Sequence, residues 1–271
     1  ERSFFCFKTN TREENAKTPP FVYVPMLDQE ELTWLQRGLK ELLFDFDDFC
    51  KQHDIAYQMT FGTLLGAIRH QGFIPWDDDV DVLMTGEELE KLQKLQKEFP
   101  KNWRLEQHRH KGIYKLFDEN QIRPWSGLPI AFDIFLIQET GSAGLVVKHW
   151  QNIIRSRKRM PSFSWRRGLI NVFKNPLRLW MRLLIAQGDR SANKNCWRYT
   201  EEIVKFSVFP KEKLFPSKPY RFEGRDLPGP QDAHWCLAHE YGTDYMTPLP
   251  PNLRKSHNKK TVGSPNTCSG K

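Results

Sequence analysis

The sequence predicts an α+β domain that carries a basic helical insertion, and three observations support this prediction. Apolar residues at three- and four-residue spacing near the start of the chain predict one long helix. Short apolar or alternating runs between residues 55 and 137 predict several strands. Beyond residue 140 the pattern becomes helical and basic. A chain of 271 residues, 39% hydrophobic and 13% aromatic, is long enough for one large domain with a packed core.

The expected elements follow in order along the chain. Asp28 and Glu31 form a capping-box pattern that starts a helix ending near residue 53. Gly62-Thr63 is expected to break the chain as a turn before a short helix at 64–69. A second capping pattern at Thr85 predicts a helix to about residue 99. The predicted strands cover residues 55–59, 79–84, 103–107, 113–117 and 130–137.

The second half of the chain is expected to be helical to about residue 204. Prolines make 210–230 an expected irregular stretch before a short helix at 232–241. The predicted segments are an irregular start at 1–25, a catalytic core at 26–140, a basic helical segment at 141–209, the C-terminal part of the catalytic domain at 210–254 and a disordered tail at 255–271.

Four carboxylates lie within five residues at the end of the run Phe73–Asp81. In a strand, residues i and i+2 point to one face, so we expect Asp77, Asp79 and Asp81 on the same side. Ligand sets made only of oxygen favour Mg²⁺ or Mn²⁺. A solvated acidic loop is the alternative. The cluster runs directly into an apolar, core-like stretch, which favours the metal site.

Other residues could complete a phosphate-handling site. Asp133 lies in an apolar strand, where a carboxylate is costly to bury unless it is paired or bound to metal. A turn cap or an arginine pair is the alternative for it. A Gly62-Thr63 turn could present N–H groups and a hydroxyl to a phosphate. Arg69, His70 and Lys115 could bind phosphate oxygens, or could only be solvated.

Residues 61–81, read as one string, closely resemble the signature of the LicD family. That family includes bacterial phosphocholine transferases and the animal ribitol-phosphate transferases fukutin and fukutin-related protein. Weaker agreement comes from Phe132-Asp-Ile-Phe, Phe222-Glu-Gly-Arg and Tyr241-Gly-Thr-Asp-Tyr-Met, so that the resemblance spans roughly residues 30–251. It implies a nucleotidyltransferase-like, polymerase-β-like fold with a mixed sheet flanked by helices.

The resemblance also implies roles by position. Asp79 and Asp81 would hold the metal with Asp133 as third carboxylate, and Asp77 takes the outer aspartate place. The residues implied to shape the donor-phosphate site are Gly62, Thr63, Gly66 and Arg69. The family implies a donor such as CDP-choline, CDP-ribitol or CDP-glycerol, and release of CMP. Tyr241-Gly-Thr-Asp-Tyr has one residue more than the expected Tyr-Gly-Asp-Tyr, which puts the role of Asp244 in doubt.

These features predict a metal-dependent phosphotransferase that moves a phospho-alcohol onto a hydroxyl of a cell-surface glycan. Phosphoryl transfer needs mainly positioning and charge neutralisation, which Mg²⁺ held by the aspartates would supply. Asp133 is the candidate acceptor of the hydroxyl proton. A polymerase-like enzyme that adds nucleotides to RNA or another polymer is the alternative. All three candidate metal ligands are present, which argues against a catalytically silent binding protein.

Residues 148–198 hold thirteen Lys and Arg residues and one acid, Asp189, interleaved with Trp and Phe. This mixture suits an anionic membrane surface, where a lipid-linked glycan acceptor would be found. The alternative is a helical insertion with its aromatics packed inward and a solvated basic face. No nucleic-acid motif accompanies the segment, so no nucleic-acid partner is expected.

The cellular compartment depends on the source of the chain. Its first residues lack a signal-peptide pattern, and no run approaches the ~18 apolar residues of a membrane span. The five scattered cysteines and the lack of an Asn-x-Ser/Thr acceptor favour a reducing compartment. We expect the cytoplasmic face of the membrane in a bacterium, and the Golgi lumen for a eukaryotic relative.

Overall fold

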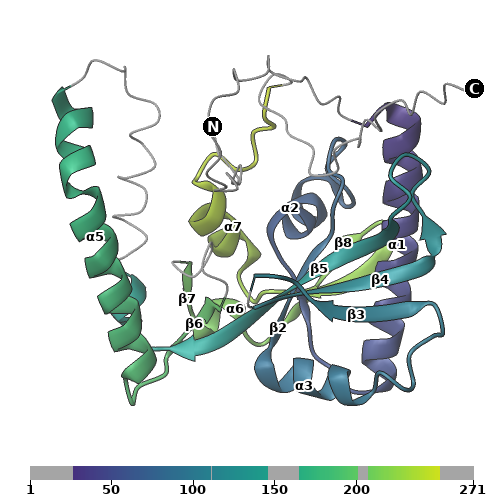
Figure 1. Cartoon of the computed structure of the whole chain (residues 1–271), viewed down its shortest axis with the longest axis horizontal. Coiled ribbons are helices and arrows are strands. Elements are labelled where there is room, and N and C mark those ends of the chain that lie inside the picture. Colours follow the sequence, from purple (N-terminus) through teal and green to yellow (C-terminus); the bar gives the residue numbers. More distant parts are fainter. Residues whose placement is uncertain (1–26, 111, 146–164, 201–206, 251–271) are drawn as a thin grey trace, which may run out of the picture.

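The fold is organised around one curled sheet that mixes parallel and antiparallel pairing, with helices packed on its faces (Figure 1). The computed structural model describes residues 27–110, 112–145, 165–200 and 207–250. The sheet strands are β1 (Gln58–Met59), β2 (Asp81–Thr85), β3 (Trp103–Gln107), β4 (Ile113–Ile122), β5 (Pro129–Thr140), β6 (Cys196–Tyr199) and β7 (Val208–Pro210), and a hairpin is formed by β8 (Lys218–Phe222) and β9 (Arg225–Gly229). The helices are α1 (Gln29–Gln52), α2 (Phe61–His70), α3 (Gly86–Lys94), η1 (Ser142–Gly144), α5 (Trp165–Arg190), α6 (Lys211–Leu214) and α7 (Ala233–Tyr241). The predicted α+β class and mixed sheet are confirmed.

Strand β5 is the centre of the sheet, whose order is β1-β2-β5-β4-β3. It pairs parallel with β2 and antiparallel with β4. Its 12 residues are long enough to pair also with β6, from Ile137 to Thr140, and β6 in turn pairs with β7. One strand therefore connects the aspartate-rich part of the fold to the part that holds α5 (Figure 1).

Helix α1 covers one face of the sheet, as its apolar spacing predicts. The capping box is confirmed: the Asp28 side chain accepts from the Glu31 N–H at 2.9 Å, and Glu31 accepts from the Asp28 N–H at 3.0 Å. The Phe46 ring meets Phe132 of β5 with ring centroids 5.1 Å apart. Each side chain buried this fully contributes roughly 1.5–3 kcal/mol of transfer free energy. The buried face of α1 comprises Leu32, Leu35, Leu39, Leu42, Leu43, Phe46, Phe49 and Cys50.

Helix α2 begins earlier than predicted. Gly62 and Thr63 do not form a turn between strand and helix; they lie in the first turn of α2, which starts at Phe61. Phe61 has a positive φ of 43°, so the change of direction occurs one residue before the predicted place. Thr60 precedes the helix in an extended conformation, and its hydroxyl shares a 2.6 Å hydrogen bond with the Tyr199 hydroxyl.

Helix α3 begins as predicted and ends early. The Thr85 side chain accepts from the Glu88 N–H at 3.4 Å, but the Glu88 carboxylate accepts from the backbone of Ala56 at 2.7 Å. The helix ends at Lys94 and turns follow, whereas the prediction extended it to about residue 99. Strand β1 is likewise shorter than predicted, and β4 and β5 are longer.

The aspartate run is not all strand. Strand β2 begins at Asp81, and residues 77–80 form a loop before it. The prediction that Asp77, Asp79 and Asp81 share one strand face is therefore wrong. Strand pairing begins only where the chain meets β5 at Asp133. The loop, rather than the pleat of a strand, decides where Asp77 and Asp79 point.

Two expectations for the second half of the chain are wrong. Residues 196–199 form strand β6 rather than helix. Residues 210–230, expected to be irregular, include α6 and the β8–β9 hairpin. The two-residue turn of this hairpin has positive φ at both Glu223 (50°) and Gly224 (88°), which matches the twist of hairpin strands. Segments 1–25 and 255–271 and part of the basic segment lie outside the described residues.

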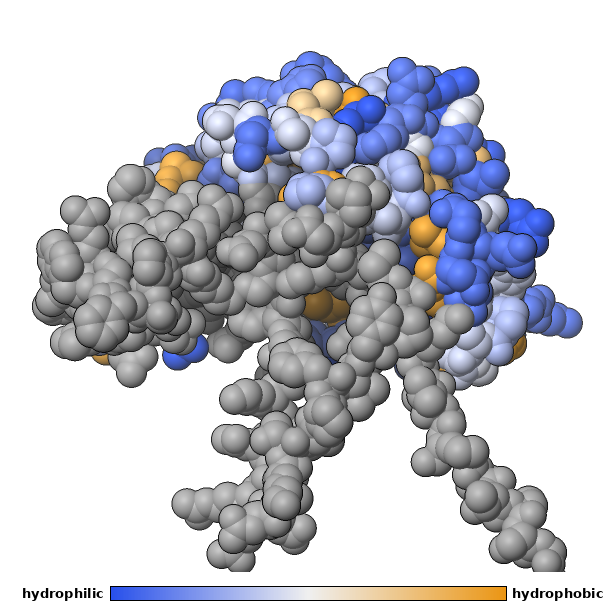
Figure 2. Space-filling model, turned by 90° about the horizontal axis from the view of Figure 1, so that it is seen from above, coloured by the Kyte–Doolittle hydropathy of each residue, from blue (hydrophilic) through white to orange (hydrophobic). Residues whose placement is uncertain are grey.

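The described surface is mainly hydrophilic when the molecule is seen from above, with apolar residues in small separate spots (Figure 2). Among the described helices, none combines the length and the apolar character needed to cross a membrane. Helix α5 is long, with 26 residues, but the charged residues along it make it too polar to cross a membrane.

Gly66 allows α2 to lie against the loop that precedes the aspartates. A Cβ at Gly66 would lie 2.3 Å from the backbone oxygen of Gly72. We expect Gly66→Ala to lower the free energy of unfolding by about 1–3 kcal/mol, because a backbone atom cannot yield as a flexible side chain can. Urea unfolding measures this change.

Gly86→Ala is the matched control, since a Cβ there meets nothing within 4 Å. We expect it to leave the free energy of unfolding unchanged or to raise it by about 0.5 kcal/mol. Equal stability of the two variants would contradict the close approach of α2 to Gly72.

Candidate active site

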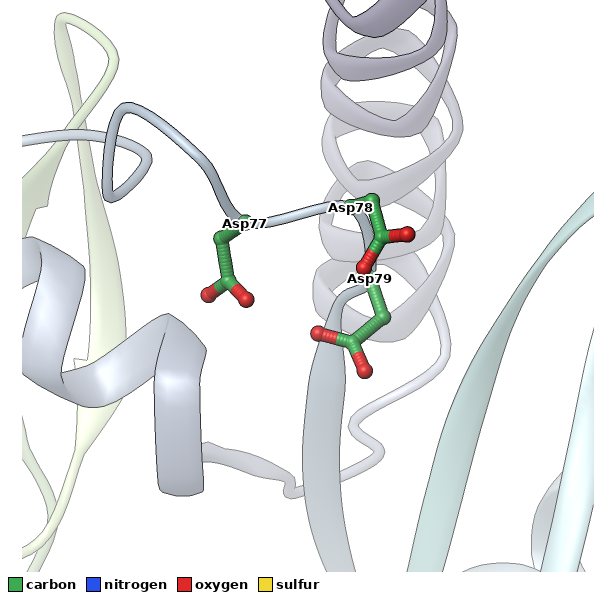
Figure 3. A group of neighbouring side chains, drawn as sticks. All are labelled: Asp77, Asp78 and Asp79. Carbon is green, nitrogen blue, oxygen red and sulfur yellow. The ribbon is translucent and has the colours of Figure 1, made fainter. Parts of the chain in front are cut away.

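Three aspartates of the loop before β2 gather their carboxyl groups. Asp77, Asp78 and Asp79 each offer an oxygen, and these atoms all lie within 4.8 Å of one another. Figure 3 shows the Asp77 and Asp79 carboxyl groups hanging on the same side of the loop. Asp78 is 1% exposed. Burial lowers the pKa of the half-buried Arg123, and the charge of Asp78 opposes that shift. The loop therefore offers the carboxyl groups of Asp77 and Asp79 to a ligand, with the more deeply buried Asp78 beside them.

Two further carboxylates lie side by side on the paired strands. Asp81 is the first residue of β2 and is opposite Asp133 in the parallel register with β5. Lys115 of β4 is opposite Asp133 on the other side, and its ammonium group forms an ion pair with the Asp133 carboxylate. The prediction that Asp133 joins the aspartate run is supported by this register, and Lys115 is placed in the same site.

Burial and mutual repulsion make ionisation of this cluster unfavourable. Burial raises the pKa of Asp77 well above its usual range, and the charges of Asp79 and Asp78 and a hydrogen bond with Asp79 raise it further. Burial likewise raises the pKa of Asp81, helped by Asp79, Asp133 and Asp77, while Lys115 opposes the shift. A divalent cation would reverse both effects, and an all-carboxylate donor set is the kind that Mg²⁺ and Mn²⁺ bind. The residues therefore fit such an ion.

The aspartate loop is fastened by residues distant in the sequence. From α1, the Gln36 amide donates to the backbone oxygen of Asp77 at 2.8 Å and to that of Ile74 at 3.3 Å. From the hairpin turn, the Glu223 N–H donates to the Gln71 oxygen at 2.9 Å, and the Glu223 carboxylate accepts from the Phe73 N–H at 3.2 Å. These contacts hold both ends of the segment that leads into Asp77.

Gly72 makes room for this fastening. A Cβ at Gly72 would lie 2.2 Å from the Glu223 carboxylate oxygen. The Phe73 ring also packs edge-on against Phe222, with centroids 5.0 Å apart. The motif Phe222-Glu-Gly-Arg, which sequence analysis left without a role, is therefore the part of the hairpin that contacts the loop.

The start of α2 supports the aspartates directly. A Cβ at Gly62 would lie 2.6 Å from an Asp77 carboxylate oxygen, so a side chain at this position would displace that carboxylate. The buried Thr63 hydroxyl accepts from the Asp81 N–H at 2.8 Å. In this arrangement Thr63 fixes the first residue of β2, and Gly66 permits the close approach to Gly72. A direct contact of these residues with a donor phosphate stays a prediction.

Arg69 and His70 lie at the other end of α2. The Arg69 guanidinium donates to the Tyr245 backbone oxygen at 2.8 Å. Burial lowers its pKa, and the nearby charge of Asp77 opposes that shift. Burial, and then the Arg69 charge, lowers the pKa of His70. Arg69 is thus close enough to the cluster to act on a phosphate there, while His70 favours its neutral form.

Tyr241 is a site residue that was not predicted from the sequence. Burial raises its pKa well above the usual range, and the charges of Asp81, Asp77 and Asp79 add to the effect, so the ring of Tyr241 lies near all three. Asp244, whose role was in doubt, is exposed. The signal was the tyrosine-containing string that starts at the end of α7, in which Tyr241 rather than Asp244 lies near the aspartates.

His108 also lies close to Asp133 and Lys115. Burial lowers its pKa, Lys115 lowers it further, and Asp133 opposes both effects. Its ring stacks on His110 with centroids 5.0 Å apart. The polar stretch after β3 carried no pattern from which this placement could be predicted.

Comparison with known proteins agrees with this geometry. Residues 54–163 match the family model described as LicD/FKTN/FKRP, nucleotidyltransferase domain. The chain is 45% identical over 246 residues to the lipopolysaccharide cholinephosphotransferase LicD of Haemophilus influenzae, which covers 78% of this chain and 90% of that relative. The chain belongs to the LicD family. The resemblance of residues 61–81 is confirmed, and the matched residues form the family's nucleotidyltransferase domain.

Shorter matches to the LicD-family chain come from uncharacterized proteins of two Rickettsia species. The protein of Rickettsia prowazekii is 35% identical over 82 residues, 28% of this chain and 31% of the relative. The protein of Rickettsia typhi is 35% identical over 83 residues, 30% of this chain and 26% of the relative.

Loss of the Glu223 carboxylate should loosen the aspartate loop of this LicD-family chain. We expect Glu223→Ala to weaken Mn²⁺ binding about tenfold, because one lost hydrogen bond is worth roughly 1–1.5 kcal/mol. Isothermal titration with Mn²⁺ measures the change. Glu223→Gln keeps an acceptor oxygen for the Phe73 N–H and is expected to retain the parent affinity within about threefold. Equal affinities for all three proteins would show that the hairpin contact does not position the loop.

The raised pKa of Asp81 sets the sign of a pH effect. The folded, metal-free chain holds the Asp81 proton more tightly than the unfolded chain, so this group's contribution to stability is lost as pH rises above about 4. We therefore expect Asp81→Asn to raise the melting temperature in EDTA at neutral pH, by about 2–4 °C per kcal/mol regained. The gain over the parent should shrink as the pH is lowered towards 4.

Asp226→Asn is the control for this effect. Asp226 pairs with Arg221 at 3.2 Å on the exposed hairpin, so its removal should leave the melting temperature nearly unchanged. Scanning fluorimetry from acid to neutral pH compares the variants. A lower melting temperature for Asp81→Asn than for the parent at neutral pH in EDTA would contradict the crowding of charge at this site.

Proposed function

We propose that this chain transfers phosphocholine from CDP-choline to a hydroxyl of a lipopolysaccharide-type glycan and releases CMP. The observation that carries the proposal is the 45% identity with a lipopolysaccharide cholinephosphotransferase across 90% of that enzyme. The clustered aspartates at the start of β2 support it, since a diphosphate donor needs divalent charge beside it. CDP-ribitol and CDP-glycerol are the other donors to compare.

The proposed roles follow from position. Asp79, Asp81 and Asp133 would hold Mg²⁺ or Mn²⁺, with Asp77 beside them. When bound, the ion would neutralise the donor diphosphate and stabilise CMP as it leaves. Arg69, near Asp77, would pair with a phosphate oxygen. Tyr241 would line the same space from α7.

The transfer step itself exchanges one P–O bond for another. The acceptor oxygen would bond to the choline-bearing phosphorus while the bond from that phosphorus to the CMP oxygen breaks. The hydroxyl proton would pass to a carboxylate, for which Asp133 is the candidate because Lys115 holds it in position. Little covalent chemistry is required of the protein beyond holding both reactants in line.

An acceptor of lipopolysaccharide type would be reached at a membrane. In a bacterium the expected place is the cytoplasmic face, where the nucleotide donor is also available. We propose a glycan acceptor and no nucleic acid, because the relative that covers most of the chain is named for lipopolysaccharide.

The test is CMP release from CDP-choline, CDP-ribitol and CDP-glycerol, with Mg²⁺ or Mn²⁺ and a truncated lipopolysaccharide acceptor. We expect release from CDP-choline, no release in EDTA, and at least a thousandfold lower rate for Asp79→Ala, which corresponds to about 4 kcal/mol of transition-state stabilisation. Asp226→Ala, on the exposed hairpin, should keep the parent rate.

Release from CDP-ribitol or CDP-glycerol alone would replace the donor and keep the reaction class. A folded chain that releases CMP from none of the three, but extends RNA with nucleoside triphosphates, would establish the polymerase-like alternative.

A further inference from the structure

Helix α5 packs one face on the protein, and side chains of another face are exposed. Met181 and Ile185 are 2% and 4% exposed and form a cluster with Cys196 of β6 and Val208 of β7. These residues are four apart on α5 and point into the sheet. The helix extends along one flank of the molecule, away from α1 and α3 (Figure 1).

The exposed face carries a stripe of large apolar side chains. Leu179 and Leu183 are each 60% exposed and Trp180 is 41% exposed, and exposed Pro176 continues the stripe at helical spacing. These residues are among the few large apolar side chains that the described surface exposes. In the sequence the same spacing extends back through Val172, Leu169 and Trp165. A stripe of this length would span roughly 27 Å at 1.5 Å per residue.

The positive charge of α5 indicates which kind of partner this face would bind. Residues 165–188 contain five arginines and lysines and no acid. The acid that follows, Asp189, is held by Arg198 at 2.8 Å and so is not available to a cationic partner. Arg182, next to the stripe, is exposed. An apolar stripe with Trp and cations but no acids matches an anionic lipid surface.

The stripe is fixed relative to the active site. The Gly141 N–H, after the end of β5, donates to the Gly188 oxygen of α5 at 2.9 Å. A Cβ at Gly188 would lie 2.7 Å from the Thr140 hydroxyl, so glycine allows α5 to pack directly on β5. The same strand carries Asp133.

We infer that the outward face of α5, centred on Leu179, Trp180 and Leu183, binds the surface of an anionic lipid bilayer. The helix lies in the interface with its apolar stripe among the acyl chains and its arginines at the headgroups. This inference concerns a surface distinct from the aspartate site and does not depend on which group the enzyme transfers.

The test is co-sedimentation of the full chain with vesicles of phosphatidylglycerol and phosphatidylcholine. We expect the double variant Leu179→Glu/Leu183→Glu to bind at least tenfold more weakly than the parent. The matched control is Leu128→Glu/Leu249→Glu, because those leucines are also exposed, at 55% and 46%, but lie elsewhere. The control should bind within twofold of the parent.

Lipid charge and salt give a second readout. Binding should fall severalfold on pure phosphatidylcholine and at high salt, because the cationic contribution is then lost or screened. If the glutamate variants change the far-UV circular dichroism, Leu179→Ser/Leu183→Ser takes their place with the same expectation.

Failure of the parent to bind anionic vesicles would overturn the inference, as would equal binding by parent and double variant. A parent that is dimeric by light scattering, with a monomeric double variant that still binds vesicles, would show instead that the stripe joins two copies of the chain. CMP release is measured without vesicles, so the transferase proposal and this inference can fail separately.

Discussion

Crowded negative charge at the start of β2 is the constraint to which the rest of the structure responds. Burial and repulsion both oppose ionisation of Asp77 and Asp81, so the isolated cluster raises the free energy of the folded chain. Parallel pairing of β2 with β5 nevertheless fixes Asp81 beside Asp133, and Lys115 supplies the compensating cation that the chain itself provides. The folded chain can hold these carboxylates ionised at low cost only when a further cation is added. The destabilised resting cluster and the divalent-ion binding that we propose would both be consequences of the same geometry.

The groups that hold this cluster come from distant parts of the chain. Gln36 reaches the loop from the first helix, and Glu223 reaches it from a hairpin near the other end. Tyr241 closes the same space from α7. This dependence supports our proposal that residues 210–254 belong to the catalytic domain, although the basic segment separates them from the core in sequence. Sequence order is therefore a poor guide to which residues work together here.

Much of the fold was predictable where the signal is local. The capping box and apolar spacing of α1, strand β3 and helix α7 follow from neighbouring residues, and so do the candidate aspartates. Predictions failed where tertiary contacts decide. Strand β6 has four residues and exists because β5 pairs with it, and the β8–β9 hairpin turns on Glu223 with positive φ, where glycine or asparagine is the usual signal. The family resemblance implies that Gly62 and Gly66 shape the donor-phosphate site. Their surroundings show close approach to Asp77 and Gly72, which no single sequence reveals.

Strand β5 carries Asp133 near its middle and ends at Thr140, against which α5 packs. The seven residue steps from Asp133 to Thr140 span about 23 Å of a sheet that cannot stretch. A helix resting on a bilayer would thereby set the height of the aspartates above the lipid. Because the length of the strand is fixed, only a sugar at a matching distance from the acceptor's lipid anchor could meet the donor. Acceptor choice in such an enzyme would be decided partly by length along the glycan, and not only by the chemistry of the sugar.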